Sequence, residues 1–154
     1  MIDTVFTVDG AKEIANKLQK FPVQIEKKIL RNAMRFGLER MKKDAQALAP
    51  KGSRQGVSKS RNGKSVRVYF PGNLKASIRH GVLKRRDKSA VIAMIYTDSG
   101  SRARHDGFYG RFVEKGTKKM QGRHFMRSAL NANAQDAINR TAEHMRQTLE
   151  KLEI

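Results

Sequence analysis

Residues 22–48 read PVQIEKKILRNAMRFGLERMKKDAQAL, and the spacing of apolar side chains in this stretch decides the fold. Apolar residues recur at steps of three and four, the period of one face of an α-helix. Pro22 suits a first helical turn, and Ala49-Pro50 ends the pattern because a residue before proline is pushed out of the α region. A long helix over residues 22–48 is therefore predicted. Its apolar stripe contains Leu30, Met34, Leu38, Met41, Ala45 and Leu48, widened by Ile25, Ile29, Ala33 and Phe36.

The chain on either side supplies the remaining elements. Upstream, VFTV at 5–8 predicts a strand, Asp9 an N-cap and residues 11–18 a helix. Downstream, alternating apolar residues predict strands at 66–70, 81–85 and 90–97, and residues 73–78 form a short helical turn or an irregular segment. A short helix over about 107–115 and a last helix from about His124 to about Lys151 complete the chain.

This order of elements predicts an α+β fold. A small antiparallel sheet of three to four strands packs against the long central helix and the long C-terminal helix. A chain of 154 residues is long enough for one core, so a single domain over residues 1–154 is expected. The segment 51–65, KGSRQGVSKSRNGKS, has turn formers and cations but almost no apolar side chains, which predicts a mobile basic loop inserted in that domain.

Positive charge is concentrated in the middle of the chain. The net charge is +19, and residues 50–88 hold twelve Lys and Arg against one acid, Asp87. A field of that size attracts nucleic acid or an acidic protein surface, whereas a solvated loop is the equally weighted alternative for residues 51–65. The side chains considered for contact with DNA or an acidic partner are Lys51, Arg54, Lys59, Arg61, Lys64, Lys84, Arg85 and Arg86.

Several site classes find no support in the sequence. The chain has no cysteine, so disulfides and Cys-based metal sites are excluded. Its four histidines are scattered without the spacing of metal ligands, and no Walker-type loop is present, so no metal or cofactor is expected. No apolar run approaches the roughly 20 residues that span a bilayer, and the N-terminus does not look like a signal peptide.

Residues 108–119, FYGRFVEKGTKK, contain one carboxylate, Glu114, just before a Gly-Thr step. Gly116 suits the left-handed residue that ends a helix, and the following lysines suit its C-terminal end. Glu114 is interpreted as structural, paired with an arginine, and as helping to fasten this turn to the last helix or to a neighbouring subunit. A catalytic acid is the weaker alternative, because neither His105, His124 nor Asp106 has the spacing of a known site.

Five segments, taken in order, carry a resemblance to a known family. They are a helix after Gly10, a long helix ending in Leu48-Ala49-Pro50, GNLKASI at 72–78, YGRFVEKGT at 109–117 and HFMRSALNAN at 124–133. Together they resemble the small tail-completion or head–tail joining proteins of long-tailed phages, a family of minor tail components. Two departures stand out: residues 51–71 look like an insertion, and His124 and Ser128 occupy places where the family tends to have prolines.

The resemblance implies a non-enzymatic virion protein at the head–tail junction, assembled in the host cytoplasm as a homo-oligomeric ring. Its implied partners are neighbouring neck and tail proteins, such as a tail terminator or head-closure protein, with contact to genomic DNA and none to a membrane. The interface or structural residues are Tyr109, Phe112, Glu114, Gly116, Thr117, Phe125 and Arg127. A sequence-independent nucleic-acid-binding protein is the alternative, and a nuclease or toxin-like enzyme ranks last.

Overall fold

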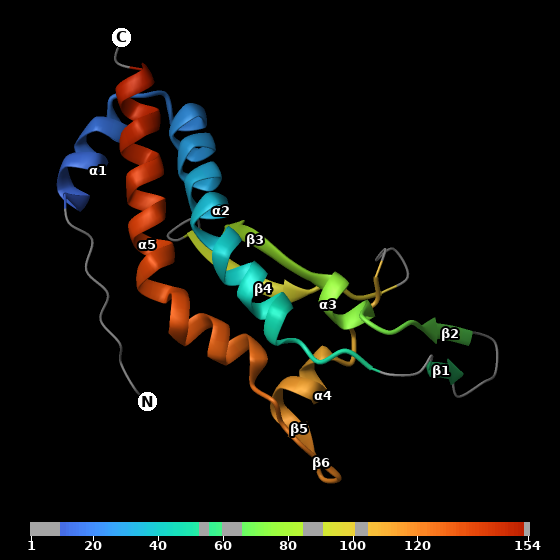
Figure 1. Cartoon of the computed structure of the whole chain (residues 1–154). Helices are drawn as coiled ribbons and strands as arrows, with labels where there is room; N and C mark the ends of the chain where they lie inside the picture. Colours follow the sequence, from blue (N-terminus) through green and yellow to red (C-terminus); the bar gives the residue numbers. More distant parts are fainter. Residues whose placement is uncertain (1–9, 53–55, 60–65, 85–90, 101–104, 153–154) are drawn as a thin grey trace. The chain divides into compact units, whose positions relative to one another are not determined.

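The computed structural model describes residues 10–52, 56–59, 66–84, 91–100 and 105–152 (Figure 1). The strand expected at 5–8 and the cap expected at Asp9 lie outside these residues. The first helix is instead preceded by Gly10, whose φ of 71° places it in the left-handed region. The helices are α1 (Ala11–Gln19), α2 (Val23–Leu48), α3 (Asn73–Ser77), α4 (Gly110–Lys115) and α5 (Phe125–Leu152). The strands are β1 (Gly56–Lys59), β2 (Val66–Tyr69), β3 (Ile78–Lys84), β4 (Val91–Thr97), β5 (Gly116–Thr117) and β6 (Met120–Gln121).

The expected α+β class is confirmed, with the long helices α2 and α5 where the apolar periodicity placed them. The strands pair two by two, as β1–β2, β3–β4 and β5–β6, instead of joining in one sheet of three to four strands. β1 lies within the segment 51–65 that was expected to be a loop, and it pairs antiparallel with β2. Short strands with few apolar residues give a weak period-two signal, which explains why β1, β5 and β6 were missed.

The chain folds into two compact units. Unit 1 comprises Met1–Met41, His80–Met94 and Asn131–Ile154, and unit 2 comprises Lys42–Arg79 and Ile95–Leu130. Each of the helices α2 and α5 is divided between the units, with one part in unit 1 and the other part in unit 2. The expectation of a single domain stays a prediction.

The core of unit 1 is made by three helices. The C-terminal part of α5 runs beside the N-terminal part of α2, and α1 lies against them (Figure 1). Gly37 permits a close approach of α2 to α5, because a Cβ at this position would lie 2.2 Å from Thr141 Oγ1 and 2.4 Å from the Ala137 carbonyl oxygen. The buried cluster contains Ile14, Leu18, Ile29, Ala33, Ala142, Met145 and Leu149.

The core of unit 2 gathers one or two residues from each of several elements. Its buried cluster contains Ala45, Ala49, Leu74, Ile78, Phe125 and Ala129. Ser77 is fully buried beside this cluster, where its hydroxyl donates to the Leu74 carbonyl and its own carbonyl accepts from the Asp98 amide. The segment GNLKASI therefore has a physical explanation: its Leu and Ile fill the core, and its Ser satisfies buried backbone groups.

The predicted apolar stripe of α2 is only partly buried. Leu38, Met41 and Ala45 are buried as expected, whereas Phe36 and Leu48 are about half exposed. In strand β4, the apolar residue Ile92 and the aromatic residue Tyr96 are exposed as well. The period identifies a helix or strand, but how far each apolar residue is covered depends on partners that the period does not reveal.

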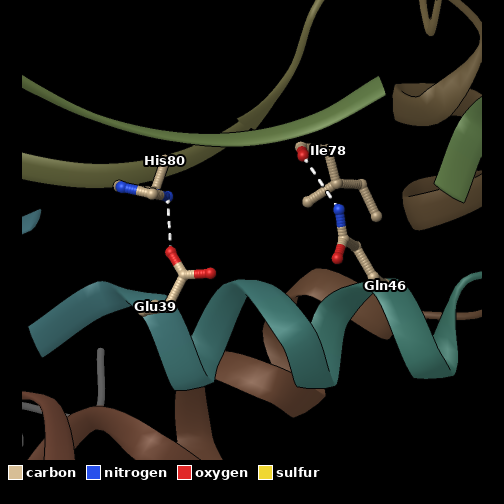
Figure 2. A network of polar contacts seen from close by, with 4 residues as sticks. All are labelled: Glu39, Gln46, Ile78 and His80. Carbon is tan, nitrogen blue, oxygen red and sulfur yellow. Dashed lines mark hydrogen bonds and ion pairs between the residues drawn. The ribbon is translucent and has the colours of Figure 1, made fainter. Parts of the chain in front are cut away.

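Polar contacts join α2 to β3 within each unit (Figure 2). In unit 1, Glu39 Oε2 lies 3.5 Å from His80 Nδ1. In unit 2, the Gln46 side-chain amide donates to the Ile78 carbonyl at 3.3 Å. Both α2 side chains point toward the strand, so side-chain contacts link β3 to α2, while the backbone of β3 pairs with β4.

Candidate interaction site

Helix α4 has one packed face and one exposed face. Tyr109 and Val113 pack against the core of unit 2, and Gly110 is buried against Leu74 and Thr97. Arg111, Phe112 and Lys115 are exposed on the other face. The Arg111 guanidinium lies 4.7 Å from the centre of the Phe112 ring, a cation–π contact. This short helix therefore presents an arginine, an aromatic ring and a lysine to solvent.

A short hairpin follows α4 and reverses the chain at a two-residue turn, Lys118–Lys119. Gly116 has φ 83° and ψ −180°, a conformation accessible essentially to glycine, and β5 then pairs with β6. A Cβ at Gly116 would lie 2.6 Å from the Gly122 nitrogen, and one at Gly122 would lie 2.6 Å from the Glu114 carbonyl oxygen. The two glycines let the returning strand lie directly against the end of α4.

Glu114 binds the beginning of α5. Its Oε2 accepts from the Met126 amide at 2.9 Å, and its Oε1 accepts from the Arg127 amide at 3.0 Å. The first amides of a helix have no partner within the helix, and the helix dipole favours negative charge there. Glu114 therefore caps α5 from a distance of twelve and thirteen residues along the chain.

The partners of Glu114 differ from the expected arginine side chain. They are backbone amides, to which both carboxylate oxygens are committed, and an arrangement of this kind stabilises a helix end. The adjoining backbone adds to the corner, because the Arg123 and His124 amides donate to the Val113 and Glu114 carbonyls. His124 has φ 48°, the left-handed region, so the corner holds a strained non-glycine residue.

The other residues singled out near this corner fall into two groups. Phe125 is buried in the core of unit 2, and Tyr109, which is partly buried, packs against this core. Thr117 shapes the turn, since its hydroxyl accepts from the Lys119 amide at 3.3 Å. Phe112 and the side chain of Arg127 are exposed. Whether any of these residues lies in a subunit interface stays a prediction.

The cations considered for DNA or an acidic partner lie largely outside the described residues. Lys51 is described and exposed. Lys59 and Lys84 lie in β1 and β3. Arg54, Arg61, Lys64, Arg85 and Arg86 lie outside the part of the chain that the structure describes.

Two features of the site were not predicted from the sequence. The close backbone approach that Gly122 permits has no local signal in the sequence. Gly107 is buried against Ser77 and Thr97, where a Cβ would lie within 2.0 Å of the Ser77 hydroxyl. Within the described ranges, no group of His, Asp and Glu is placed to hold a metal ion, and no helix is both long and apolar enough to cross a membrane.

The comparison with protein families gives one result that covers most of the chain. The profile of the family described as "Bacteriophage HK97-gp10, putative tail-component" matches residues 12–116, which run from α1 to Gly116 of the capped corner. Comparisons with curated proteins and with solved structures each gave no match. Because the matched segment covers more than half of the chain, this protein belongs to the HK97-gp10-like family and is a phage tail component.

Proposed function

We propose that this tail component is a non-enzymatic structural protein that completes the tail at the head–tail junction, as a ring of identical subunits. The observation that carries the proposal is the family match, taken with the exposure of large apolar side chains on both units. Its location is the virion neck or tail, after assembly in the host cytoplasm. The neighbours are neck and tail proteins, such as a tail terminator or a head-closure protein.

The exposed apolar side chains support assembly with other chains. In unit 1, Val23 and Leu152 are about half exposed, and in unit 2, Val57, Val66 and Phe70 are exposed by 56–61%. In β1–β2, Lys59 lies opposite Val66 and Val57 opposite Val68, so Val57 and Val66 belong to the same face of the hairpin. A two-stranded hairpin is marginally stable alone, and burial of this face against another chain would stabilise it.

The presence of exposed apolar side chains on both units supports the ring arrangement. Some of them belong to unit 1 and others to unit 2. A contact between two different surfaces of identical subunits is heterologous, and it closes into a ring when the rotation between subunits permits. The proposed contact therefore joins the β1–β2 hairpin of one subunit to unit 1 of the next.

The capped corner supports a structural role over a catalytic one. Glu114, the one carboxylate in the segment 108–127, has both oxygens bound by the amides of α5. A general acid or base must instead face a substrate within hydrogen-bond reach. The role we assign to Glu114 is to fix the orientation of α5 relative to α4 within unit 2.

The experiment that tests the proposal follows both the mass of the protein and the particles it completes. We expect native mass spectrometry to detect a closed oligomer, and Val57→Asp or Phe70→Asp to reduce it to monomer. A phage lacking this chain should accumulate separate filled heads and tails, and the wild-type gene should restore joined particles. Joined, infectious particles without the chain would overturn the proposal.

A second candidate function is sequence-independent binding of nucleic acid. It is favoured by the charge of unit 2, whose residues include 18 Lys and Arg against four acids. Phosphate binding would weaken log-linearly with salt concentration, because each neutralised phosphate releases counterions. A titration of a DNA duplex at several salt concentrations measures this slope, and a flat dependence would remove the candidate.

A further inference from the structure

The corner between α4 and α5 carries a dense group of exposed cations. We call residues 111–127 the basic tip, which consists of the end of α4, the β5–β6 hairpin and the start of α5 (Figure 1). Every Lys and Arg side chain in this segment is exposed. These side chains are Arg111, Lys115, Lys118, Lys119, Arg123 and Arg127.

The positive charge of the basic tip is not balanced locally. Its one carboxylate, Glu114, is bound to the amides of Met126 and Arg127. None of the six cations forms an ion pair with an acid among the described residues; Arg111 instead contacts the Phe112 ring. Like charges this close repel one another, so a negative partner would stabilise the tip.

A second copy of this chain does not provide that partner. Unit 1 holds 15 Lys and Arg against 10 acids, a net charge of +5, and unit 2 holds 18 against four, a net charge of +14. Neither unit is acidic, so placing the tip on another copy would bring positive charge to positive charge. The occupant that fits the tip is therefore a different molecule with negative charge.

Exposed apolar side chains favour a protein over DNA as this occupant. Phe112 and Met120 are exposed by 37% and 44% among the cations. Protein interfaces are enriched in aromatic residues, Met and Arg, with an apolar centre and a polar rim. Phosphate contacts need cations and hydrogen-bond donors, and they do not use an exposed methionine.

The tip is also held in shape before any partner arrives. Hydrogen bonds from the Arg123 and His124 amides join the returning strand to the end of α4, and Gly116 adopts the conformation that this approach requires. The Glu114 carboxylate in turn joins α4 to the start of α5. A preorganised surface loses less conformational entropy on binding than a free loop would. The cations of the tip therefore project from a defined backbone, which suits recognition of a specific protein surface.

We propose that the basic tip docks onto an acidic protein surface with an apolar centre, carried by a different protein of the phage particle. This proposal rests on the proposed role in the tail for the identity of the partner as a virion protein. The cations would form the rim of the interface, and Phe112 and Met120 its apolar part.

The chemistry of the tip is tested first on the purified, full-length protein with three synthetic probes. These probes are a peptide that mixes glutamates with leucines, an oligoglutamate of equal charge, and a DNA duplex. We expect the mixed peptide to bind best, and the double variant Phe112→Ser, Met120→Ser to weaken it about tenfold without changing duplex binding. Leu48→Ser, an exposed apolar position in unit 2 outside the basic tip, is the matched control and should bind the peptide normally.

The test in the particle uses charge reversal. Arg111→Glu, Lys115→Glu and Arg123→Glu are combined, and Lys12→Glu, Lys28→Glu and Arg35→Glu, all exposed in unit 1, form the control. We expect the tip variant to keep its oligomer mass and thermal unfolding but to be depleted from purified particles about tenfold relative to the control. Suppressor mutations should replace Asp or Glu by Lys in another virion protein.

Three outcomes would overturn the proposal. In the first, the charge-reversed tip variant and its control enter particles equally. In the second, the tip substitutions leave binding of the mixed peptide unchanged. In the third, the double variant Phe112→Ser, Met120→Ser mainly loses binding of the DNA duplex. Because peptide binding is measured on the isolated protein, it can succeed even if the ring or its place in the tail is wrong. Loss of the oligomer in native spectra would count against the proposed ring, and not against the tip.

Discussion

In unit 1, helices α2 and α5 approach each other across a glycine, and aliphatic side chains from three helices fill the space beside them. In unit 2, α4 meets α5 through a carboxylate bound to two backbone amides, next to two glycines in close backbone contact. Unit 1 therefore depends on apolar packing, whereas the α4–α5 corner depends on hydrogen bonds and backbone conformation. The stability of unit 1 therefore tolerates substitutions of polar surface residues. The stability of the α4–α5 corner falls when a single hydrogen-bonding atom is replaced.

The largest expected effect is in the packed part of α2. Leu38→Asp places an unpaired carboxylate at a side chain that is 6% exposed, and we expect it to lower the free energy of unfolding by about 4 kcal/mol or more. Asn32→Asp, exposed on the same helix, is the control and should change it by less than about 0.5 kcal/mol. Urea unfolding followed by circular dichroism measures both. A normally stable Leu38→Asp protein would refute the assigned core of α2.

The next effect separates backbone conformation from steric contact at the corner. Gly116→Ala combines an unfavourable conformation with a Cβ 2.6 Å from the Gly122 nitrogen, and we expect a loss of about 3 kcal/mol. Gly100 also has a positive φ, but a Cβ there meets none of the described residues within 4 Å, so Gly100→Ala should cost about 1 kcal/mol. If Gly116→Ala and Gly100→Ala lower the free energy of unfolding equally in thermal unfolding, the close backbone contact at Gly116 does not stabilise this corner.

A smaller effect is expected for the carboxylate itself. Glu114→Gln keeps one acceptor oxygen but turns an amide group toward a backbone donor, which should cost about 1–2 kcal/mol. Glu143→Gln alters an exposed carboxylate 3.9 Å from Arg146 and should cost less than about 0.5 kcal/mol. Hydrogen exchange at the Met126 and Arg127 amides provides a local readout. Unchanged protection in Glu114→Gln would show that the cap contributes little.

The smallest expected effect has the opposite sign. His124 occupies the left-handed region at φ 48°, and glycine adopts this conformation without the steric penalty of a Cβ. We expect His124→Gly to raise the free energy of unfolding by up to about 1 kcal/mol. Differential scanning calorimetry measures the change. A clear loss of stability would mean that the His124 side chain makes a contact that outweighs the strain.

The features of the two regions that have a local signal in the sequence could be predicted from it. The extents of α2 and α5 were predictable, because a long apolar period marks both helices and prolines flank α2. The positive φ of Gly116 was predictable, since a glycine after a short amphipathic helix indicates a left-handed residue, but its ψ of −180° differs from that of the αL helix cap expected there. The structural role of Glu114 followed from its position beside that glycine and from the absence of a plausible catalytic partner.

The partners of these residues were not predictable, because they depend on contacts between distant segments. Glu114 was expected to face an arginine and instead binds amides, which every residue except proline carries and no sequence pattern marks. In α5, the polar residue Asn133 is buried, and the apolar residue Leu130 is about half exposed. Such positions are decided by what packs against the helix.

The bond between Glu114 and the start of α5 has a consequence for the order in which the chain folds. The Met126 and Arg127 amides lie only twelve and thirteen residues after Glu114. Closing a loop of this length costs the unfolded chain little conformational entropy. Contacts of such short range form early on a folding pathway. We therefore expect the α4–α5 corner to be a nucleus whose disruption slows refolding more than it speeds unfolding, a pattern that stopped-flow measurements on Glu114→Gln would show.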